Sequence, residues 1–189
     1  MSEEDGILGE STAPLKRGPL ALVLVALFFS GVASIVNQVV WQRALKIFLG
    51  GSETISAMVV VLVFMMGLGL GAGLIGRYAQ RLRNPLRTFA LLEVGLFVTN
   101  VVLAFLLSLD LSETVYAAQR VAVSVGIPLR AVYAVGACLM LLPPTVLMGA
   151  TLPAASEACQ RQLAATQSSL ITVLFFLNTV GAVVGAFAG

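Results

Sequence analysis

The sequence predicts an all-α membrane protein, a polytopic bundle of about five transmembrane helices with one further helix at the membrane interface. Its 189 residues are 59% hydrophobic and only 11% charged, whereas soluble domains carry roughly 25% charged residues. Apolar runs long enough to cross a bilayer core of about 30 Å recur along the chain. Together these features exclude a soluble globular domain, a disordered chain and a disulfide scaffold.

Five stretches have the length and apolar character of a transmembrane helix. They are Leu20–Val40, Thr54–Gly76, Thr88–Leu109, Ala131–Ala150 and Ser168–Gly189. The first stretch also fits a signal peptide, because Lys16 and Arg17 precede its apolar core and small residues follow at 31–34. Its apolar run continues to Trp41, which favours an uncleaved span.

The segments outside these spans divide the chain into a tail, residues 1–18, and a transmembrane domain, residues 19–189. The tail is acidic and contains Gly and Pro, so we expect a disordered cytoplasmic segment. Residues 111–127 are too short to cross, but their apolar residues recur at steps of three and four. This pattern predicts an amphipathic helix at the outer interface.

The last predicted span stops at Gly189 without the anchoring residues that normally follow a span. We therefore expect these residues to be the N-terminal part of a larger protein, or to need a partner. The alternative is a terminus that reaches the outer interface.

Basic residues in the short connections predict the orientation, because such residues favour the cytoplasmic side. One side carries seven of them: Lys16, Arg17, Arg77, Arg81, Arg83, Arg87 and Arg161. The other side carries four: Arg43, Lys46, Arg120 and Arg130. The N-terminus is therefore expected in the cytoplasm. A formal net charge of +2 gives no reason to expect a nucleic-acid partner.

Glycines recur at steps of four in the second and fifth predicted spans. The pairs are Gly67 with Gly71, Gly69 with Gly73, and Gly181 with Gly185. Lipid provides no hydrophobic drive for helix pairing, so small residues that allow close backbone approach favour packing. We expect these faces to pack against other helices; the alternative is a sliding surface in a transporter. No strand precedes the glycine run, which argues against a nucleotide-binding fingerprint.

Polar side chains in or beside the spans are the candidates for transport or partner contacts, because burial in lipid is costly without a partner. They are Asn37, Gln38, Arg43, Arg77, Arg81, Glu93, Asn100 and Asn178. We expect the amides to form hydrogen bonds between helices. Glu93 has two interpretations, pairing with Arg87 or Arg77 at the interface, or proton coupling.

Pro143 and Pro144 fall inside the fourth predicted span, so this helix should bend or break. Either a static kink or a broken, cavity-lining helix would result. The chain contains no histidine and no metal-ligand spacing, and Cys138 and Cys159 lie in different environments. We expect no metal site, no cofactor and no disulfide.

Three blocks follow one another over about residues 30–189. The first is GVASIVNQVVWQRALKIFLGGSETISAMVVVLVFMMGLGLGAGLIGRYAQRLRNPLRTFALLE, and the later two are LPPTVLMGATLPAASEA and LFFLNTVGAVVGAFAG. Together they resemble the membrane domain of the bacterial fused major-facilitator/spermidine-synthase-like proteins. The resemblance implies a major-facilitator-like half in the bacterial inner membrane, usually followed by a soluble aminopropyltransferase-like domain. These 189 residues lack that domain, so we expect no enzyme activity from them.

Two positions depart from the family pattern. Asn37 and Gln38 stand where the family commonly has Tyr-Glu, and Gln80 stands where it often has Asp. Both changes remove a carboxylate, and moving a polyamine cation through a low dielectric needs compensating negative charge. These losses favour a structural role over polyamine transport.

Two functions remain, and they belong to different classes. The first is an accessory or structural membrane subunit that packs against membrane-protein subunits or a second copy of itself, surrounded by lipid. The second is part of a transporter for polyamines or related small cations. A synthase-like soluble domain on another chain is one implied partner. Catalysis within the membrane lacks a nucleophile–base pair.

Overall fold

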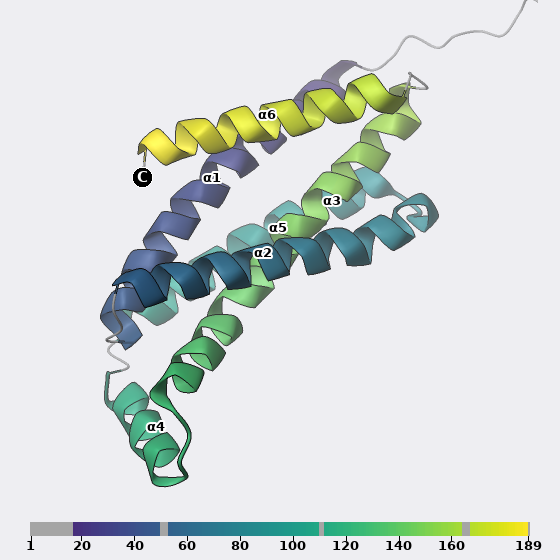
Figure 1. Cartoon of the computed structure of the whole chain (residues 1–189). Helices are drawn as coiled ribbons and strands as arrows, with labels where there is room; N and C mark the ends of the chain where they lie inside the picture. The colour runs from purple at the N-terminus through teal and green to yellow at the C-terminus, as the bar shows by residue number, and fades with distance from the viewer. Residues whose placement is uncertain (1–16, 50–52, 110–111, 164–166, 189) are drawn as a thin grey trace, which may run out of the picture.

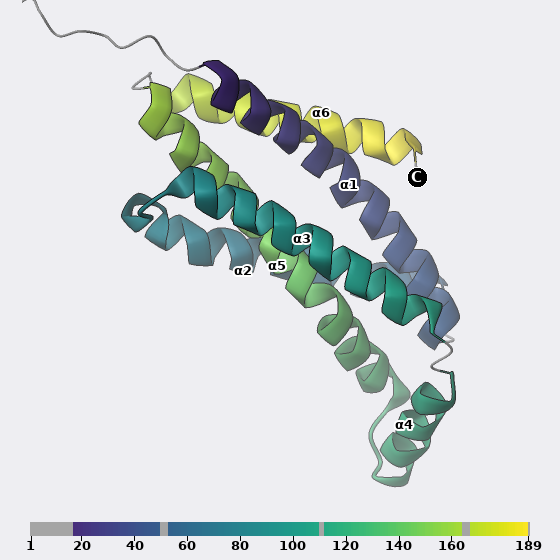
Figure 2. The ribbon, with the colours of Figure 1, turned by 180° about the vertical axis from the view of Figure 1, so that it is seen from behind.

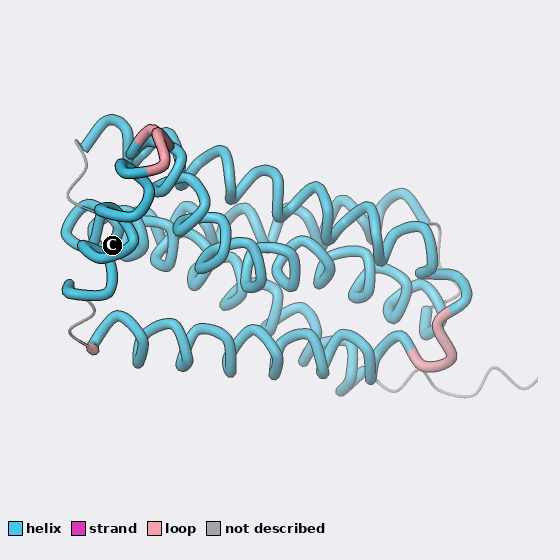
Figure 3. Tube along the Cα trace, turned by 90° about the horizontal axis from the view of Figure 1, so that it is seen from below, coloured by secondary structure: helices cyan, strands magenta, loops and turns pink. Residues whose placement is uncertain are grey.

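A computed structural model describes residues 17–49, 53–109, 112–163 and 167–188, and these ranges are helical without any strand. The elements are α1 (Arg17–Leu49), α2 (Glu53–Tyr78), the 3-10 turn η1 (Ala79–Arg81), α3 (Pro85–Ser108), α4 (Ser112–Ser124), α5 (Leu129–Leu163) and α6 (Gln167–Ala188). The long helices run beside one another (Figure 1), and the described loops lie at the two ends of the bundle (Figure 3).

Five helices of the described chain are long and apolar enough to cross a membrane. They are α1, α2, α3, α5 and α6, which confirms the predicted all-helical, membrane-type architecture. Between 11% and 44% of the most apolar window in each is buried inside the chain. Most of the apolar surface therefore faces outward, and lipid or other helices must cover it.

The sixth helix, α4, covers 13 residues of the segment for which an interfacial helix was expected. Ala122 is buried, while Tyr116, Val121 and Val123 are exposed. A 13-residue helix spans about 20 Å, which is less than the bilayer core. It lies at the end of the bundle where α1 ends and α5 begins (Figure 1).

Helix α1 is longer than the sequence predicted and continues nine residues past Val40 to Leu49. Trp41 and Leu45 on this extension are buried, at 3% exposure each. Hydropathy did not predict this extension, because Gln42, Arg43 and Lys46 alternate with these apolar residues. The inward-facing residues nevertheless keep helical spacing.

Helix α5 runs unbroken through Pro143, Pro144 and Pro153, so of the two expected alternatives, a kink or a break, the break is wrong. A break inside a bilayer would leave backbone groups without hydrogen-bond partners, which favours a continuous helix. Neighbours also support it, because α2 and α3 both pack extensively against α5. In the same turn, the Thr145 hydroxyl donates to the Leu141 carbonyl at 2.8 Å.

Helix α5 also extends 13 residues beyond the predicted end at Ala150. Cys159, which follows that predicted end in the sequence, lies inside α5 and is 1% exposed. Ala154, Ala155 and Ala158 share its buried face. The polar residues between these small side chains lower the mean hydropathy of the segment and hid the end of this helix. Both cysteines are free.

Two hydrophobic clusters stabilise the bundle at different levels along the helices. The first lies towards the end where α1 finishes and contains Trp41, Leu45, Val60, Val63, Phe64, Leu96, Leu103, Ala137, Leu141 and Met148. The second lies towards the start of α1 and contains Val23, Leu27, Phe89, Ala154, Ala155, Cys159 and Leu174. Helices α1, α3 and α5 contribute to both, and they therefore hold the two clusters together.

Glycines bring α2 and α5 into backbone contact. A methyl group at Gly67 would collide with Thr145, and one at Gly71 would collide with the backbone of Val146. Reciprocally, a methyl at Gly149 of α5 would meet the backbone of Leu68. Close backbone approach increases van der Waals contact where lipid provides no hydrophobic drive for pairing.

The same arrangement joins α1 and α6, which lie against each other in Figure 2. A methyl at Gly31 would collide with the Asn178 carbonyl, and one at Gly181 with the Phe28 carbonyl. Gly185 faces the backbone of Val32 in the same way. Helix α6 packs mainly on α1, so much of its remaining surface is exposed, including Phe187 at 90%.

Gly69 and Gly73 differ from their neighbours on α2. No described atom lies within 4 Å of the position that a Cβ would take at either residue, and the same holds for Gly76. The α2–α5 contact therefore uses only one of the two predicted glycine faces. The other face is open within the described chain.

Replacing Gly71 by Leu should destabilise the bundle, because the side chain has no space between α2 and α5. We expect a loss of about 3 kcal/mol or more, or about 5–10 °C in Tm, measured by thermal unfolding in detergent. Gly73→Leu on the open face is the matched control and should leave the Tm of the monomer nearly unchanged. Equal losses for both variants would contradict the α2–α5 contact.

Candidate functional site

A polar layer separates the two hydrophobic clusters on the inner side of α1. Ser30 and Ser34 lie between Leu27 of one cluster and Trp41 of the other, and the spacing keeps them on one helix face. Ser30 is 7% exposed, and the Ser34 hydroxyl approaches the Met148 sulfur of α5 at 3.0 Å. Polar groups at this depth need partners, so the layer is a candidate site.

Glu93 of α3 contributes a carboxyl group to this layer. Its side chain hydrogen-bonds with Ser30 of α1. The second oxygen, Oε1, is buried and has no hydrogen-bond partner in the described structure. Glu93 is therefore an acidic group at membrane depth whose partner is a neutral hydroxyl.

The expected pairing of Glu93 with Arg77 or Arg87 is absent from the described chain. Helical geometry explains this for Arg87, because six residues on an α-helix correspond to a rotation of about 240° and place the two side chains on different faces. Arg87 is exposed, whereas Glu93 faces α1. A carboxylate inside a span without a cationic partner marks a functional site by default.

The side-chain amides in the spans do not form the interhelical hydrogen bonds that the sequence predicted. The Asn100 amide donates to the Leu96 carbonyl of its own helix at 2.9 Å. No hydrogen bond connects the side chains of Asn37, Gln38 or Asn178 to another described residue, and all three are half-buried. Their chemistry is therefore available to a ligand, water or a neighbouring helix.

The second candidate region is the end of the bundle that carries the start of α1, η1 and the end of α5. We call it the arginine-rich end, because Arg77, Arg81, Arg83, Arg87 and Arg161 all lie there and are exposed. Arg43 is exposed near the opposite end of α1. This distribution agrees with the charge asymmetry from which the orientation was predicted.

Arg161 connects the end of α5 to the turn between α2 and α3. Its Nε donates to Glu157 Oε1 at 2.7 Å, and its Nη2 donates to the Gln80 carbonyl at 2.8 Å. Sequence reasoning missed Glu157 because the fourth span was expected to end at Ala150. The spacing of Glu157 and Arg161, i and i+4, was the signal that could have found the pair.

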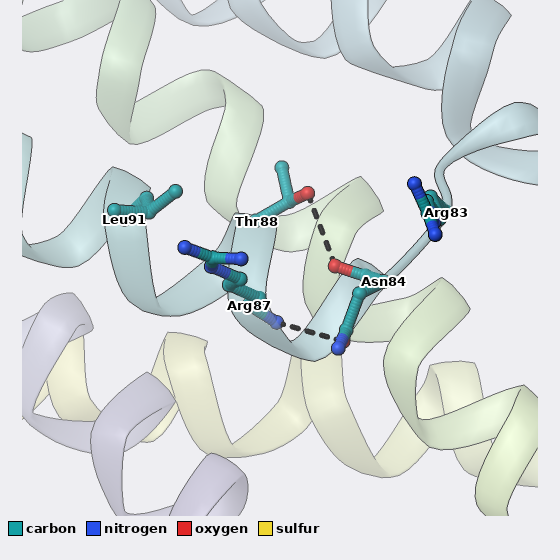
Figure 4. A pocket seen from close by; sticks show the side chains of 5 residues that line it. All are labelled: Arg83, Asn84, Arg87, Thr88 and Leu91. Atoms are coloured by element: carbon teal, nitrogen blue, oxygen red, sulfur yellow. Dashed lines mark hydrogen bonds between the residues drawn. The ribbon is translucent and has the colours of Figure 1, made fainter.

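An open pocket lies beside the start of α3, lined by Arg83, Asn84, Arg87, Thr88 and Leu91 (Figure 4). Asn84 is the N-cap of α3, and its side-chain oxygen accepts from the Arg87 backbone N–H at 3.2 Å. Pro85 follows at the first helical position, as is common at helix starts. The Asn-Pro sequence therefore sets where α3 begins and places both arginines around the cap.

The described residues contain no group of three or more His, Cys, Asp or Glu side chains that could hold a metal ion. No family model matches the chain, and no curated protein or solved structure shows significant similarity to it. The polar layer at Glu93, the open glycine face and the arginine-rich end are therefore the features that bear on function.

Removing the double contact of Arg161 should loosen the α2–α3 turn. In Arg161→Lys one ammonium group replaces two guanidinium donors that point in different directions, and partial exposure limits the cost to about 1 kcal/mol. We expect faster hydrogen exchange in residues 79–84, by about fivefold, measured by mass spectrometry.

The control for this change is Gln160→Ala, which removes only a bond to Ser156 of the same helix. It should leave exchange in residues 79–84 unchanged. Equal exchange in both variants would show that Arg161 does not hold the turn.

Proposed function

We propose that this chain is an integral membrane subunit that packs against further transmembrane helices, an accessory or structural role. The observation that carries the proposal is the open glycine face of α2. At Gly69, Gly73 and Gly76, no described atom lies within 4 Å of the place that a Cβ would occupy, although the glycines of the neighbouring face make backbone contact with α5.

An open glycine face is costly unless something packs on it. Glycine in a helix interior is destabilising by roughly 0.5–1 kcal/mol relative to Ala. Lipid chains would pack against Leu at these positions at least as well as against Gly. Close approach of another backbone compensates for this cost. Exposed Leu62, Met65 and Met66 continue the face along α2, so a partner helix could contact several turns.

The proposed origin of the subunit is the transporter-like membrane domain of spermidine-synthase-like proteins, a major-facilitator-like half. The ordered sequence blocks support this origin, and the all-helical architecture with five membrane-length helices is compatible with it. The same resemblance implies a bacterial inner-membrane location, and the charge asymmetry supports an orientation with the arginine-rich end in the cytoplasm. A synthase-like soluble domain on another chain would then lie at this end.

Self-association in liposomes tests the structural role, with a second copy of the chain as the partner. We expect energy transfer between donor- and acceptor-labelled copies. Gly69→Leu/Gly73→Leu should lower the apparent association constant at least about tenfold. Steric bulk on the open face should block packing without changing the Tm of the monomer.

Ala104→Leu is the control, because Ala104 is exposed on α3, outside the glycine face of α2. It should associate like the wild type. A wild-type chain that remains monomeric at every protein-to-lipid ratio would contradict a role based on self-association.

A second candidate function is part of a transporter for polyamines or related small cations. The buried Glu93 carboxyl group, with a Ser30 hydroxyl as its partner, supports it. A cation that crosses the layer between the two hydrophobic clusters would find a carboxyl group there and no competing arginine.

Uptake of labelled spermidine into proteoliposomes separates the two functions. The structural role predicts no accumulation above that of protein-free vesicles. Accumulation that Glu93→Gln abolishes, and that Glu113→Gln on exposed α4 leaves intact, would replace the structural role by transport. Both substitutions remove one carboxylate and keep the side-chain shape, so only the location differs.

A further inference from the structure

We propose that the pocket at the start of α3 binds the phosphate group of an anionic phospholipid, whose acyl chains lie along the exposed face of α3. The pocket combines two guanidinium groups with the first residue of an apolar helix face (Figure 4). The proposal depends on the chain being in a membrane, and it is independent of which function in the preceding section is correct.

The positive charge in this pocket is available to a ligand. Arg83 and Arg87 are exposed, and no side-chain hydrogen bond or ion pair engages either guanidinium group within the described ranges. The described acidic side chain at this end of the bundle is Glu157, which is paired with Arg161. Arginine binds phosphate oxygens through paired N–H donors, so two free guanidinium groups fit a phosphodiester.

The charge comes from the arginines and not from the start of the helix. The Asn84 side chain already accepts from the Arg87 backbone N–H, and the Thr88 hydroxyl donates to the Asn84 carbonyl at 3.2 Å. Figure 4 shows the Arg83 and Arg87 side chains on either side of Asn84. A ligand that bridges them would lie over the cap, at the level where α3 enters the apolar region.

The apolar surface beyond the pocket favours a lipid over free phosphate. Leu91 lines the pocket and is 62% exposed. The same helix continues with exposed Val94, Phe97, Val98, Val101 and Phe105. Only 11% of the apolar window of α3 is buried inside the chain. A phosphate group held at the arginines would place acyl chains against this surface, whereas a soluble anion would leave it uncovered.

Titration of the full-length chain in detergent with phosphatidylglycerol, followed by native mass spectrometry, tests the site. Phosphatidylcholine is the uncharged reference lipid. We expect the wild type to bind one phosphatidylglycerol molecule about tenfold more tightly than phosphatidylcholine, and Arg83→Gln/Arg87→Gln to remove this preference. The single variants should each lose about threefold, which keeps the test informative if the double variant does not fold.

The matched control is Arg77→Gln/Arg81→Gln, which removes the same charge from the same end outside the pocket. Its preference for phosphatidylglycerol should stay within about twofold of the wild type. An equal loss in both double variants would overturn the proposal, because the effect would then be general electrostatics.

Two other occupants of the pocket give distinct results. Inorganic phosphate that displaces phosphatidylglycerol at an equal concentration would identify a site for soluble anions and overturn the lipid assignment. The N-terminal segment is the other rival, because its sequence contains Glu3, Glu4, Asp5 and Glu10. If a lipid preference emerges only after these four residues are changed to Gln or Asn, the segment occupies the pocket and the proposal is wrong.

Discussion

Close backbone contact between helices is the interaction on which the rest of this structure depends. In a bilayer, apolar side chains gain little from leaving lipid for a neighbouring helix, so van der Waals contact and hydrogen bonding must provide the stability. Glycines provide that contact twice, between α2 and α5 and between α1 and α6. Helix α5 is central because it also packs against α3 and carries residues of both hydrophobic clusters.

The closely packed helices leave large surfaces uncovered, and other molecules can pack on these surfaces. Helix α2 uses Gly67 and Gly71 internally and leaves Gly69 and Gly73 open. Helix α3 is covered by α5 along one side and is exposed along most of the other. Such faces can be covered by a partner helix or by lipid. A face of small residues allows the close approach of a helix, whereas a face of bulky residues is suited to acyl chains.

Basic and acidic side chains lie at different levels along the bundle. Arginines gather at one end, where Arg161 also connects α5 to the turn after α2. Glu93 lies deeper, beside Ser30 and apart from every arginine of the described chain. The separation is physically consistent, because exposed guanidinium groups remain solvated at an interface, whereas a carboxyl group at depth has only the hydroxyl groups that neighbouring helices offer. The arginine-rich end is therefore suited to an anionic ligand, and the region around Glu93 is suited to a cation or a proton.

Hydropathy and charge in the sequence were enough to determine the helical class, the number of membrane-length helices, the extra helix before α5 and the concentration of arginines at one end. These properties depend on the composition of single segments, so no contact between segments is needed to infer them. Only the tertiary structure decided which glycine face of α2 packs, that α5 continues through Pro143 and Pro144, and that Glu93 meets Ser30 in place of an arginine. Such outcomes depend on the rotation of each helix about its axis and on the neighbour it meets, which a one-dimensional pattern does not contain.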